Sequence, residues 1–484
     1  MKYFKFRKIA EELHRLDYLG RLSGLRSAIQ FKFVLLTLFS FVMASLVGFF
    51  LMDTGMSRPA VFMASIFVLA GLLWITEALP LFATALVIIS LEIILISNPG
   101  NWKGLGNLVG ENPDYRIFLD PLSDPIIILF LGGFILAQAA VKEGIDKSLA
   151  SNILRIFGSK PKTVMLGLMV ITSIFSMWMS NTATTAMMIA LTVPLTAQIP
   201  VKDPFRKALI LCIPFAANIG GLGTPIASPP NAVAVAFLKN VGVDISFLSW
   251  MIIAVPLVIV LLIITWILLW VLYKPKEEIA LYSVAHKIDG RGVYVMIVFL
   301  TTIVLWLSDR WHGLPTSVIA LVPILCFTTT GIIRRSDINS LEWHILILIA
   351  GGIALGLGMK ITGLDHIIVD LIPKNGKLIF PLLIVSTTLL STFMSNTAAA
   401  NLLIPLGVSF AMSQGEKGSI IEIGIGIAFA ASVAMSLPIS TPPNAIAYAK
   451  GNLSSRDFVT AGSLIGIMAL VIIFVARWIY HLWV

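Results

Sequence analysis

One five-residue stretch occurs twice in this sequence, each time in the middle of an apolar segment. Both Met179–Ala183 and Met394–Ala398 read Met-Ser-Asn-Thr-Ala. Each copy is followed, 51 and 49 positions after its serine, by a Pro-Pro-Asn motif that ends at Asn231 or Asn444. Small polar residues can simply join transmembrane helices through hydrogen bonds, but this does not explain two copies paired with two proline breaks at nearly one spacing. The pattern therefore predicts an internal duplication.

A second pair of matching segments supports the same duplication. The pair Gly132–Gly133 precedes Asp146, and the pair Gly351–Gly352 precedes Asp365, with both matches 219 positions apart. Between the two halves, the stretch from Lys274 to Arg291 is hydrophilic. We expect this stretch to be the linker between the repeats.

Composition places the chain among membrane proteins. Of its 484 residues, 58% are hydrophobic and only 12% are charged, whereas soluble domains carry about 25% charged residues. Continuous apolar runs of transmembrane length recur from Phe31 onward, which excludes the alternating pattern of an outer-membrane barrel. Cys212 and Cys326 lie in apolar segments and offer no disulfide framework. The net charge of +9 reflects loops that face the cytoplasm and not a nucleic-acid partner.

We predict an all-α polytopic membrane protein with about 11 transmembrane helices, two re-entrant hairpins and two broken helices. The hairpins are expected at Thr163–Ile199 and Lys377–Met412, because each segment is too long for one span and carries Ser-Asn-Thr at its centre. The broken helices are expected at Ala208–Leu238 and Ser419–Tyr448. In chain order the predicted parts are a cytoplasmic amphipathic helix (1–30), a first half (31–273), a cytoplasmic linker (274–291) and an inverted second half (292–484).

Basic residues predict the orientation in the membrane. With a cytoplasmic N-terminus and an extracytoplasmic C-terminus, the loops that fall inside hold most of the Lys and Arg, as the positive-inside rule requires. The first hairpin then enters from the cytoplasm and the second from outside, which is the inverted-repeat arrangement of secondary transporters. We expect a multi-pass protein of the inner, or plasma, membrane. The predicted inside loops are Lys142–Lys162, Ile199–Lys207, Lys274–Arg291, Arg334–Arg335 and Lys450–Arg456.

The breaks also predict a chemistry. An interrupted helix exposes carbonyl groups at one half-end and amide groups at the other. Carbonyl and side-chain oxygens of Ser, Thr and Asn suit a small hard cation such as sodium, whereas amides and helix N-termini suit a carboxylate or another oxyanion. Neither Lys nor Arg occurs at any break. A bound dianion would therefore need bound cations to neutralise it, which predicts cation coupling.

These motifs resemble the divalent anion–sodium symporter family, the bacterial relatives of the solute carrier family 13 dicarboxylate and citrate transporters. The resemblance rests on the two Ser-Asn-Thr tips, on Ser228–Asn231 and Thr441–Asn444, and on Trp74–Ala78, and it extends from about Phe31 to the end of the chain. It implies a secondary active transporter and not an enzyme. It also implies coupling by sodium ions without an organic cofactor, and a homodimer whose transport domain moves like an elevator against a fixed scaffold.

The resemblance further implies which residues bind the ions and the substrate. Met394 and Ser440 would act through their backbone carbonyls, and position 227 is an alanine that has no side-chain ligand to offer. The first sodium site would comprise Ser176, Ser180, Asn181 and Ala227, and the second Ser391, Met394, Asn396 and Ser440. Substrate would contact Asn181, Thr182, Ser228, Asn396, Thr397 and Thr441.

Several alternatives remain open at this point. The favoured substrate is a C4-dicarboxylate such as succinate, malate or fumarate, while citrate or sulfate transport and sodium-independent dicarboxylate exchange are alternatives. A proton-coupled carrier needs a titratable group in its core, for which Glu77 and Glu92 are the candidates, and Glu77 at the Pro80 turn is better explained as structural. An intramembrane enzyme would need His or paired acids at membrane depth, but the six histidines fall in loops or at span ends. Sodium stoichiometry and direction stay undetermined.

Overall fold

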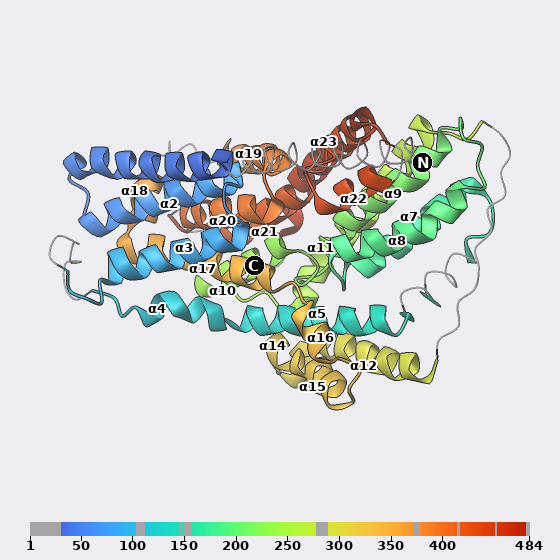
Figure 1. Cartoon of the computed structure of the whole chain (residues 1–484), viewed down its shortest axis with the longest axis horizontal. Coiled ribbons are helices and arrows are strands. Elements are labelled where there is room, and N and C mark those ends of the chain that lie inside the picture. Colours follow the sequence, from blue (N-terminus) through green and yellow to red (C-terminus); the bar gives the residue numbers. More distant parts are fainter. Residues whose placement is uncertain are drawn as a thin grey trace, which may run out of the picture.

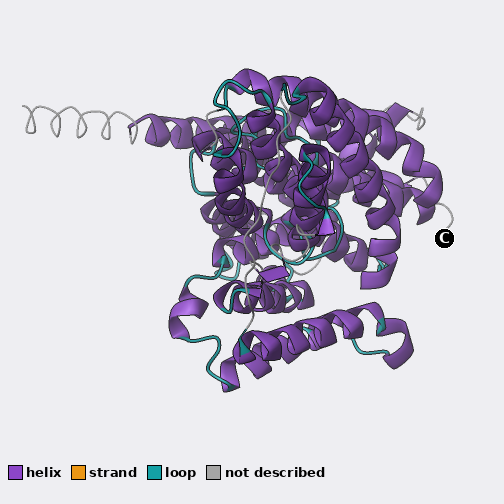
Figure 2. Ribbon diagram, turned by 90° about the vertical axis from the view of Figure 1, so that its right-hand side faces the viewer, coloured by secondary structure: helices purple, strands orange, loops and turns teal. Residues whose placement is uncertain are grey.

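The computed structural model describes residues 31–102, 112–145, 148–149, 156–276, 289–370, 378–413, 417–450 and 453–480. Helices are the only regular elements in these ranges (Figure 2). The predicted amphipathic helix of residues 1–30 and most of the predicted linker lie outside the described residues. The prediction of an all-α polytopic membrane protein is confirmed.

Seven of the described helices are long and apolar enough to cross a membrane. The other predicted crossings are built from shorter apolar helices, several of which end where a hairpin tip or a break interrupts the apolar segment. The seven long spans are Phe31–Thr54, Arg58–Thr76, Arg116–Lys142, Phe247–Leu272, Gly290–Leu307, Trp343–Thr362 and Ser455–Arg477.

One set of helices surrounds α17 (Trp343–Thr362), and we call it the scaffold group. It contains the helix at 31–51, α2 (Arg58–Thr76), α3 (Leu81–Glu92) and α5 (Pro125–Lys142), and α17 packs directly against the last three (Figure 1). The group also includes α12 (Gly290–Leu307), α14 (Thr316–Ile319) and α15 (Leu321–Thr329), which pack against α5.

The turn between α2 and α3 shows the role of Glu77. Glu77 is exposed and adopts a left-handed backbone conformation (φ 48°) at the end of α2. The Nε1 atom of the fully buried Trp74 donates to the carbonyl of Leu81 at 3.3 Å and holds the two helices together. Because Glu77 lies exposed at this turn, its position agrees with a structural role and not with that of a titratable group in the core.

Two helix pairs occupy the segments in which the re-entrant hairpins are predicted. The first consists of α7 (Pro161–Ser176) and α8 (Asn181–Thr196), and the second of α19 (Ile379–Phe393) and α20 (Asn396–Ser413). In both tips the serine of Ser-Asn-Thr is the N-cap of the second arm, because its hydroxyl accepts the amide of the residue three positions later, at 3.3 Å in the first hairpin and 3.2 Å in the second. Serine favours this position because it satisfies an otherwise unpaired amide.

The two broken helices divide as predicted. The first consists of α9 (Phe205–Gly220) and α10 (Pro229–Asn240), and the second of α21 (Lys417–Ser432) and α22 (Pro442–Lys450). The two prolines of each Pro-Pro-Asn motif start the second segment, where the missing amide hydrogen costs nothing. Each break is therefore a local consequence of its own sequence.

The broken helices interlock the two halves of the chain. The segment α10 belongs to the first half but packs against α20 and α21 of the second, while α22 packs against α8 and α9 of the first. The first hairpin arms, α7 and α19, pack against α9 and α21. The helices α11 (Phe247–Leu272) and α23 (Ser455–Tyr480) pack against each other, and α11 also packs against α9 and α23 against α21. We call the set formed by both hairpins, both broken helices, α11 and α23 the hairpin body.

The repeated Gly-Gly pairs lie where the scaffold group meets the hairpin body. A side chain added at Gly132 or Gly351 would collide with Ala320 or Ala85 of the scaffold group. One added at Gly352 would collide with the amide of Asn401 in α20 of the hairpin body. Each glycine pair therefore allows close packing that a larger residue would prevent.

The remaining described elements are short. They are η1 (Met52–Thr54), η2 (Ile93–Ser97), α4 (Arg116–Leu119), η3 (Asp120–Ser123), α13 (Asp309–His312), α16 (Arg335–Asn339) and α18 (Leu364–Asp370). Of these, α18 packs against α20 and so joins the scaffold group to the hairpin body.

Candidate functional site

Two matching clusters of oxygen atoms lie behind the hairpin tips. In the first, the hydroxyl oxygen of Ser176 is 2.6 Å from Asn181 Oδ1 and 2.7 Å from the carbonyl oxygen of Ala217. In the second, the hydroxyl of Ser391 is 2.9 Å from Asn396 Oδ1 and 2.7 Å from the carbonyl of Ala431. Both serines are fully buried. The structure thus joins each tip to the end of the first segment of its broken helix.

The clusters contain more oxygen atoms than hydroxyl protons. A serine hydroxyl has one proton to donate, yet each of these hydroxyls lies within hydrogen-bonding distance of two acceptor oxygens. With Oδ1 of the asparagine facing the serine, one of the two close oxygen pairs in each cluster has no shared proton. A small hard cation would satisfy such a group of hydroxyl, amide and carbonyl oxygens, as at the broken helices of sodium-coupled transporters.

Two further hydroxyl groups attach the breaks to the hairpins. Thr224 Oγ1 donates to the carbonyl of Met177 at 2.5 Å, and Ser440 Oγ donates to the carbonyl of Thr392 at 2.9 Å. The Ser440 hydroxyl also accepts the Leu437 amide at 3.1 Å. Because the Ser440 hydroxyl already donates one hydrogen bond and accepts another, its backbone carbonyl is the group that could face an ion.

The remaining predicted ion ligands are backbone positions at the same junctions. Ala227 lies in the first break and is 4% exposed. Met394 has extended backbone angles (φ −127°, ψ 173°) between the two arms of the second hairpin and is 3% exposed. Both residues are buried, so their carbonyl groups are shielded from bulk water.

The predicted substrate residues of the two breaks meet partners from the opposite half. Ser228 Oγ is 3.5 Å from Ser432 Oγ of α21. Asn218 Nδ2 of α9 donates to Thr441 Oγ1 at 3.1 Å and to Asn444 Oδ1 at 3.4 Å. These contacts bring both breaks to one buried region between the halves.

The threonines of the two tips, Thr182 and Thr397, lie in the first turns of α8 and α20. The amide groups of a first helical turn have no acceptors within the helix. The tips therefore offer amide donors for an anion beside the oxygen clusters, but within the described residues no hydrogen bond connects the tip threonines to either break.

Asn218, Ser432 and Thr224 were not among the site residues predicted from the sequence. Asn218 and Ser432 occupy corresponding places near the ends of α9 and α21, so aligning the two repeats beyond their motifs would have found the pair. Their significance depends on contacts across more than 200 positions, which no local motif contains.

An acidic residue that the sequence analysis did not consider contacts the first tip. Ser180 Oγ donates to Glu342 Oε1 at 3.2 Å, and Glu342 immediately precedes α17. The second carboxylate oxygen is buried and has no hydrogen-bond partner among the described residues. Burial raises the pKa of Glu342, and the hydrogen bond from Ser180 and the charge of His344 partly oppose this shift. The sequence feature that could have indicated Glu342 is its position directly before the apolar span that contains Gly351–Gly352.

Glu92 lies elsewhere. It is fully buried at the end of α3, and a side chain added at Gly358 of α17 would collide with its carboxylate and with Met63 of α2. All three residues belong to the scaffold group, so Glu92 is not part of the region that joins the tips and breaks.

Comparison with known proteins identifies similar chains. A family model described as a citrate transporter matches residues 71–420 and again 303–483. The sodium-dependent dicarboxylate transporter SdcS of Staphylococcus saprophyticus is 30% identical over 461 residues, which cover 86% of this chain and 85% of that protein.

Two fungal relatives are much longer. The inorganic phosphate transporter PHO87 of Saccharomyces cerevisiae is 29% identical over 83% of this chain, and an uncharacterized transporter of Schizosaccharomyces pombe is 31% identical over 82%. The chain spans 44% and 47% of these two proteins, or about half of their length.

One solved structure has a related fold. The crystal structure of the Alcanivorax borkumensis YdaH transporter matches with a TM-score of 0.53 and 13% sequence identity, covering 83% of this chain and 97% of that one. At this identity the match concerns the fold alone.

Proposed function

Since the chain belongs to the citrate transporter family, a group of divalent-anion transporters and not of enzymes, we propose that it is a sodium-coupled symporter of a small dicarboxylate. Succinate, malate and fumarate are the favoured substrates. The Staphylococcus relative, which matches over most of both chains, is a sodium-dependent dicarboxylate transporter. Citrate, sulfate and phosphate are the competing anions, and sodium-independent exchange is the competing mode.

The observation that carries this proposal is the pair of oxygen clusters at Ser176 and Ser391. Each cluster offers hydroxyl, amide and carbonyl oxygens, and neither break contains Lys or Arg. Two bound sodium ions would supply the two positive charges that balance a dianion. A carrier without sodium would need a basic side chain in their place.

We assign the ligands as follows. Sodium at the first tip uses Ser176, Ser180, Asn181 and Ala227, and sodium at the second uses Ser391, Met394, Asn396 and Ser440. The carboxylate of Glu342 adds negative charge beside the first ion through its contact with Ser180. The dianion is held between the ions by Asn181, Thr182, Ser228, Asn396, Thr397 and Thr441.

Counterflow in proteoliposomes tests the function. With labelled succinate, uptake should require sodium and fall to background when choline replaces it. Unlabelled malate and fumarate should compete more strongly than citrate, sulfate or phosphate. Linkage requires that succinate raise the apparent sodium affinity by the factor by which sodium raises succinate affinity. Equal uptake in choline and sodium would instead indicate an exchanger or a proton-driven carrier.

We further propose that the hairpin body moves against the scaffold group in an elevator-type mechanism, and that the scaffold groups of two chains form a homodimer. Both tips and both breaks belong to the hairpin body. Because α10 and α22 cross into the opposite halves, the tips and breaks are coupled and would move together. Light scattering of the purified detergent complex would measure the oligomeric state.

A further inference from the structure

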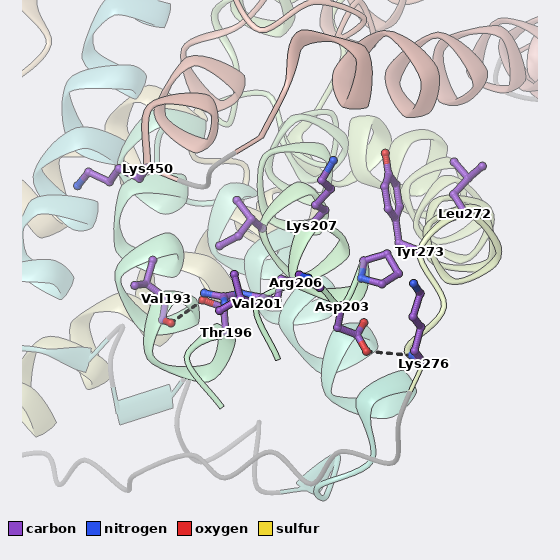
Figure 3. Close-up of a pocket in the computed structure, with 13 residues that line it drawn as sticks. Val193, Thr196, Val201, Asp203, Arg206, Lys207, Leu272, Tyr273, Lys276 and Lys450 are labelled. Atoms are coloured by element: carbon purple, nitrogen blue, oxygen red, sulfur yellow. Dashed lines mark hydrogen bonds between the residues drawn. The ribbon is translucent and has the colours of Figure 1, made fainter. Parts of the chain in front are cut away.

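A pocket of about 1020 Å³ opens in the hairpin body (Figure 3), and its lining contains no residue of the two oxygen clusters. The end of α8, the loop into α9, the end of α11 and the end of α22 form its walls. Its lining contains one acidic side chain, Asp203, and five basic ones: Lys202, Arg206, Lys207, Lys276 and Lys450.

The pocket collects three loops that the charge pattern assigns to the same side of the membrane. Ile199–Lys207, Lys274–Arg291 and Lys450–Arg456 were each predicted to be cytoplasmic, and each contributes a basic lining residue. The convergence of these segments gives a basic pocket at the membrane face that the positive-inside rule assigns to the cytoplasm.

Two of the charged lining residues have structural partners. Lys207 Nζ is 3.0 Å from the carboxylate of Asp457, which also accepts the Tyr273 hydroxyl at 3.2 Å. The carboxylate of Asp203 accepts the backbone amides of Phe205 at 2.8 Å and of Lys276 at 2.9 Å. Asp203 thereby fixes the loop and holds the backbone of residue 276 against the start of α9.

The remaining basic residues give the pocket a positive potential. Lys202, Arg206, Lys276 and Lys450 share the pocket with the single carboxylate of Asp203. In Figure 3, Lys276 and Lys450 lie on opposite sides of the pocket, with Arg206 between them. A guanidinium group binds two oxygens of one phosphate at once, and lysines add point charges around it. The lining is therefore suited to a phosphate anion.

Three aliphatic side chains also line the pocket. Val193 at the end of α8 is 41% exposed, Leu272 at the end of α11 is 38% exposed and Val201 between α8 and α9 is 85% exposed. A free phosphate needs no exposed aliphatic side chains around it, whereas a phospholipid has acyl chains that would cover them. We propose that this pocket binds a phosphate-bearing anion, with the headgroup of an anionic phospholipid favoured as the source over a soluble phosphate. Such a ligand would bridge four elements of the hairpin body.

Thermal stability in nanodiscs tests this proposal without using transport as the readout. The midpoint of unfolding of the full chain should rise by about 3 °C when phosphatidylglycerol is added to phosphatidylcholine discs. The variant Lys202→Gln/Arg206→Gln/Lys276→Gln should lose this rise. The variant Lys32→Gln/Lys160→Gln/Arg335→Gln removes three exposed charges of the same predicted face outside the pocket, and it should keep the rise.

Two further sets of measurements identify the source of the phosphate and exclude misfolding of the pocket variant as the cause of a lost response. Inorganic phosphate and glycerol 3-phosphate, each added to phosphatidylcholine discs, would raise the midpoint only if a soluble anion is the ligand, and the pocket variant should abolish that rise too. The single variants Lys202→Gln and Lys276→Gln change exposed side chains, and each should lower the rise by part of its value. An equal response of the pocket variant and the wild type, or the absence of a rise in every arm, would overturn the proposal.

Discussion

Asn181 and Asn396 each place an amide oxygen in an oxygen cluster and begin the second arm of a hairpin. Replacement by alanine removes one proposed ion ligand, which is also the residue of its tip that we assign to both ion and substrate. A hydrogen bond to a charged group contributes about 1.5–3 kcal/mol, so Asn181→Ala and Asn396→Ala should each lower sodium-dependent succinate uptake by roughly 10- to 100-fold. Uptake into proteoliposomes, normalised to folded protein from gel filtration, measures the change.

Thr388→Val is the matched control for this pair. Thr388 Oγ1 donates to the carbonyl of Ala430 at 3.1 Å, one residue before the carbonyl that Ser391 contacts, and it lies outside the oxygen cluster. The control should keep most of the uptake. Uptake at the wild-type rate in either asparagine variant would contradict the assignment of that asparagine as a ligand of ion and substrate.

Glu342 provides a pH-dependent prediction. Burial raises its pKa, so the charged form is less stable in the folded protein than in the unfolded chain. This unfavourable contribution is absent below the ordinary pKa of a glutamate, develops as the pH rises towards the raised folded-state pKa, and is complete above it. Glu342→Gln should therefore raise the unfolding midpoint at pH 8 by about 1–3 °C, and the gain should shrink as the pH approaches 4.5.

Differential scanning fluorimetry of the sodium-free protein between pH 4.5 and 8 would measure this gain. Glu77→Gln removes the exposed carboxylate of the α2–α3 turn and is the control. A gain that is constant with pH would show that the substitution acts through packing and not through the charge of residue 342.

At the level of single residues, the sequence pointed to the two tip segments because their contacts depend on local chain geometry. The structure adds that Ser180 and Ser395 cap helices, and that Ser176 and Ser391 lie within hydrogen-bonding distance of the asparagines five positions after them. Glu342 could not be predicted in this way, because its contact with Ser180 joins segments 162 positions apart. Asn218 was missed for the same reason.

Asn231 and Asn444 determine the shape of the breaks at the scale of elements. Asn231 Nδ2 donates to the carbonyls of Gly221 and Thr224, both at 2.8 Å, and Asn444 Nδ2 donates to those of Met435 and Leu437, both at 2.9 Å. Both amides are fully buried. They satisfy carbonyl groups that the interrupted helices leave without partners.

Asn231→Ala should therefore destabilise the fold itself. Two lost hydrogen bonds and two buried unpaired carbonyls cost about 2–4 kcal/mol, which should lower the unfolding midpoint by several degrees even without sodium or substrate. Asn240→Ala, at the exposed end of the same helix, should leave it unchanged. If the Asn231→Ala variant kept the wild-type unfolding midpoint but lost transport, Asn231 would bind a ligand and would not be needed to stabilise the break.

The sequence predicted the hairpins and breaks to within a few residues because Pro, Ser and Asn act on the backbone next to them. The crossing of α10 and α22 into opposite halves was not predicted. Nor was the π-helical end of α3 at Ile93–Ser97. The crossing depends on packing between distant helices, and the apolar composition that all the spans share does not specify which of them pack together.

At the scale of the whole molecule, two ion pairs attach α23 to the broken helices of both halves. Asp457 near its start pairs with Lys207 of α9 at 3.0 Å, and Arg477 near its end pairs with Glu422 of α21 at 2.5 Å. Together with the crossing of α10 and α22, these pairs join the hairpin body into one unit. Its boundary with the scaffold group is the place where relative motion would have to occur.

Cross-linking across that boundary tests whether the hairpin body moves as a unit. Gly71 of α2 faces Leu402 of α20, with 3.8 Å between an ideal Cβ at Gly71 and a Leu402 methyl carbon. Cysteines at these two positions, in a chain with Cys212 and Cys326 replaced, should be bridged by mercuric ion. The bridge should stop sodium-dependent uptake almost completely, because it fixes α2 to α20, and a thiol should restore uptake.

A bridge within the hairpin body separates rigid-body motion from local gating. Thr388 of α19 contacts the backbone of Ala430 in α21, so cysteines at these positions restrain the second hairpin against its own broken helix. If the body moves as one unit, this bridge should leave uptake largely intact while the Gly71–Leu402 bridge stops it. The opposite result, loss of uptake from the internal bridge alone, would mean that the hairpin opens locally while the rest of the body stays in place.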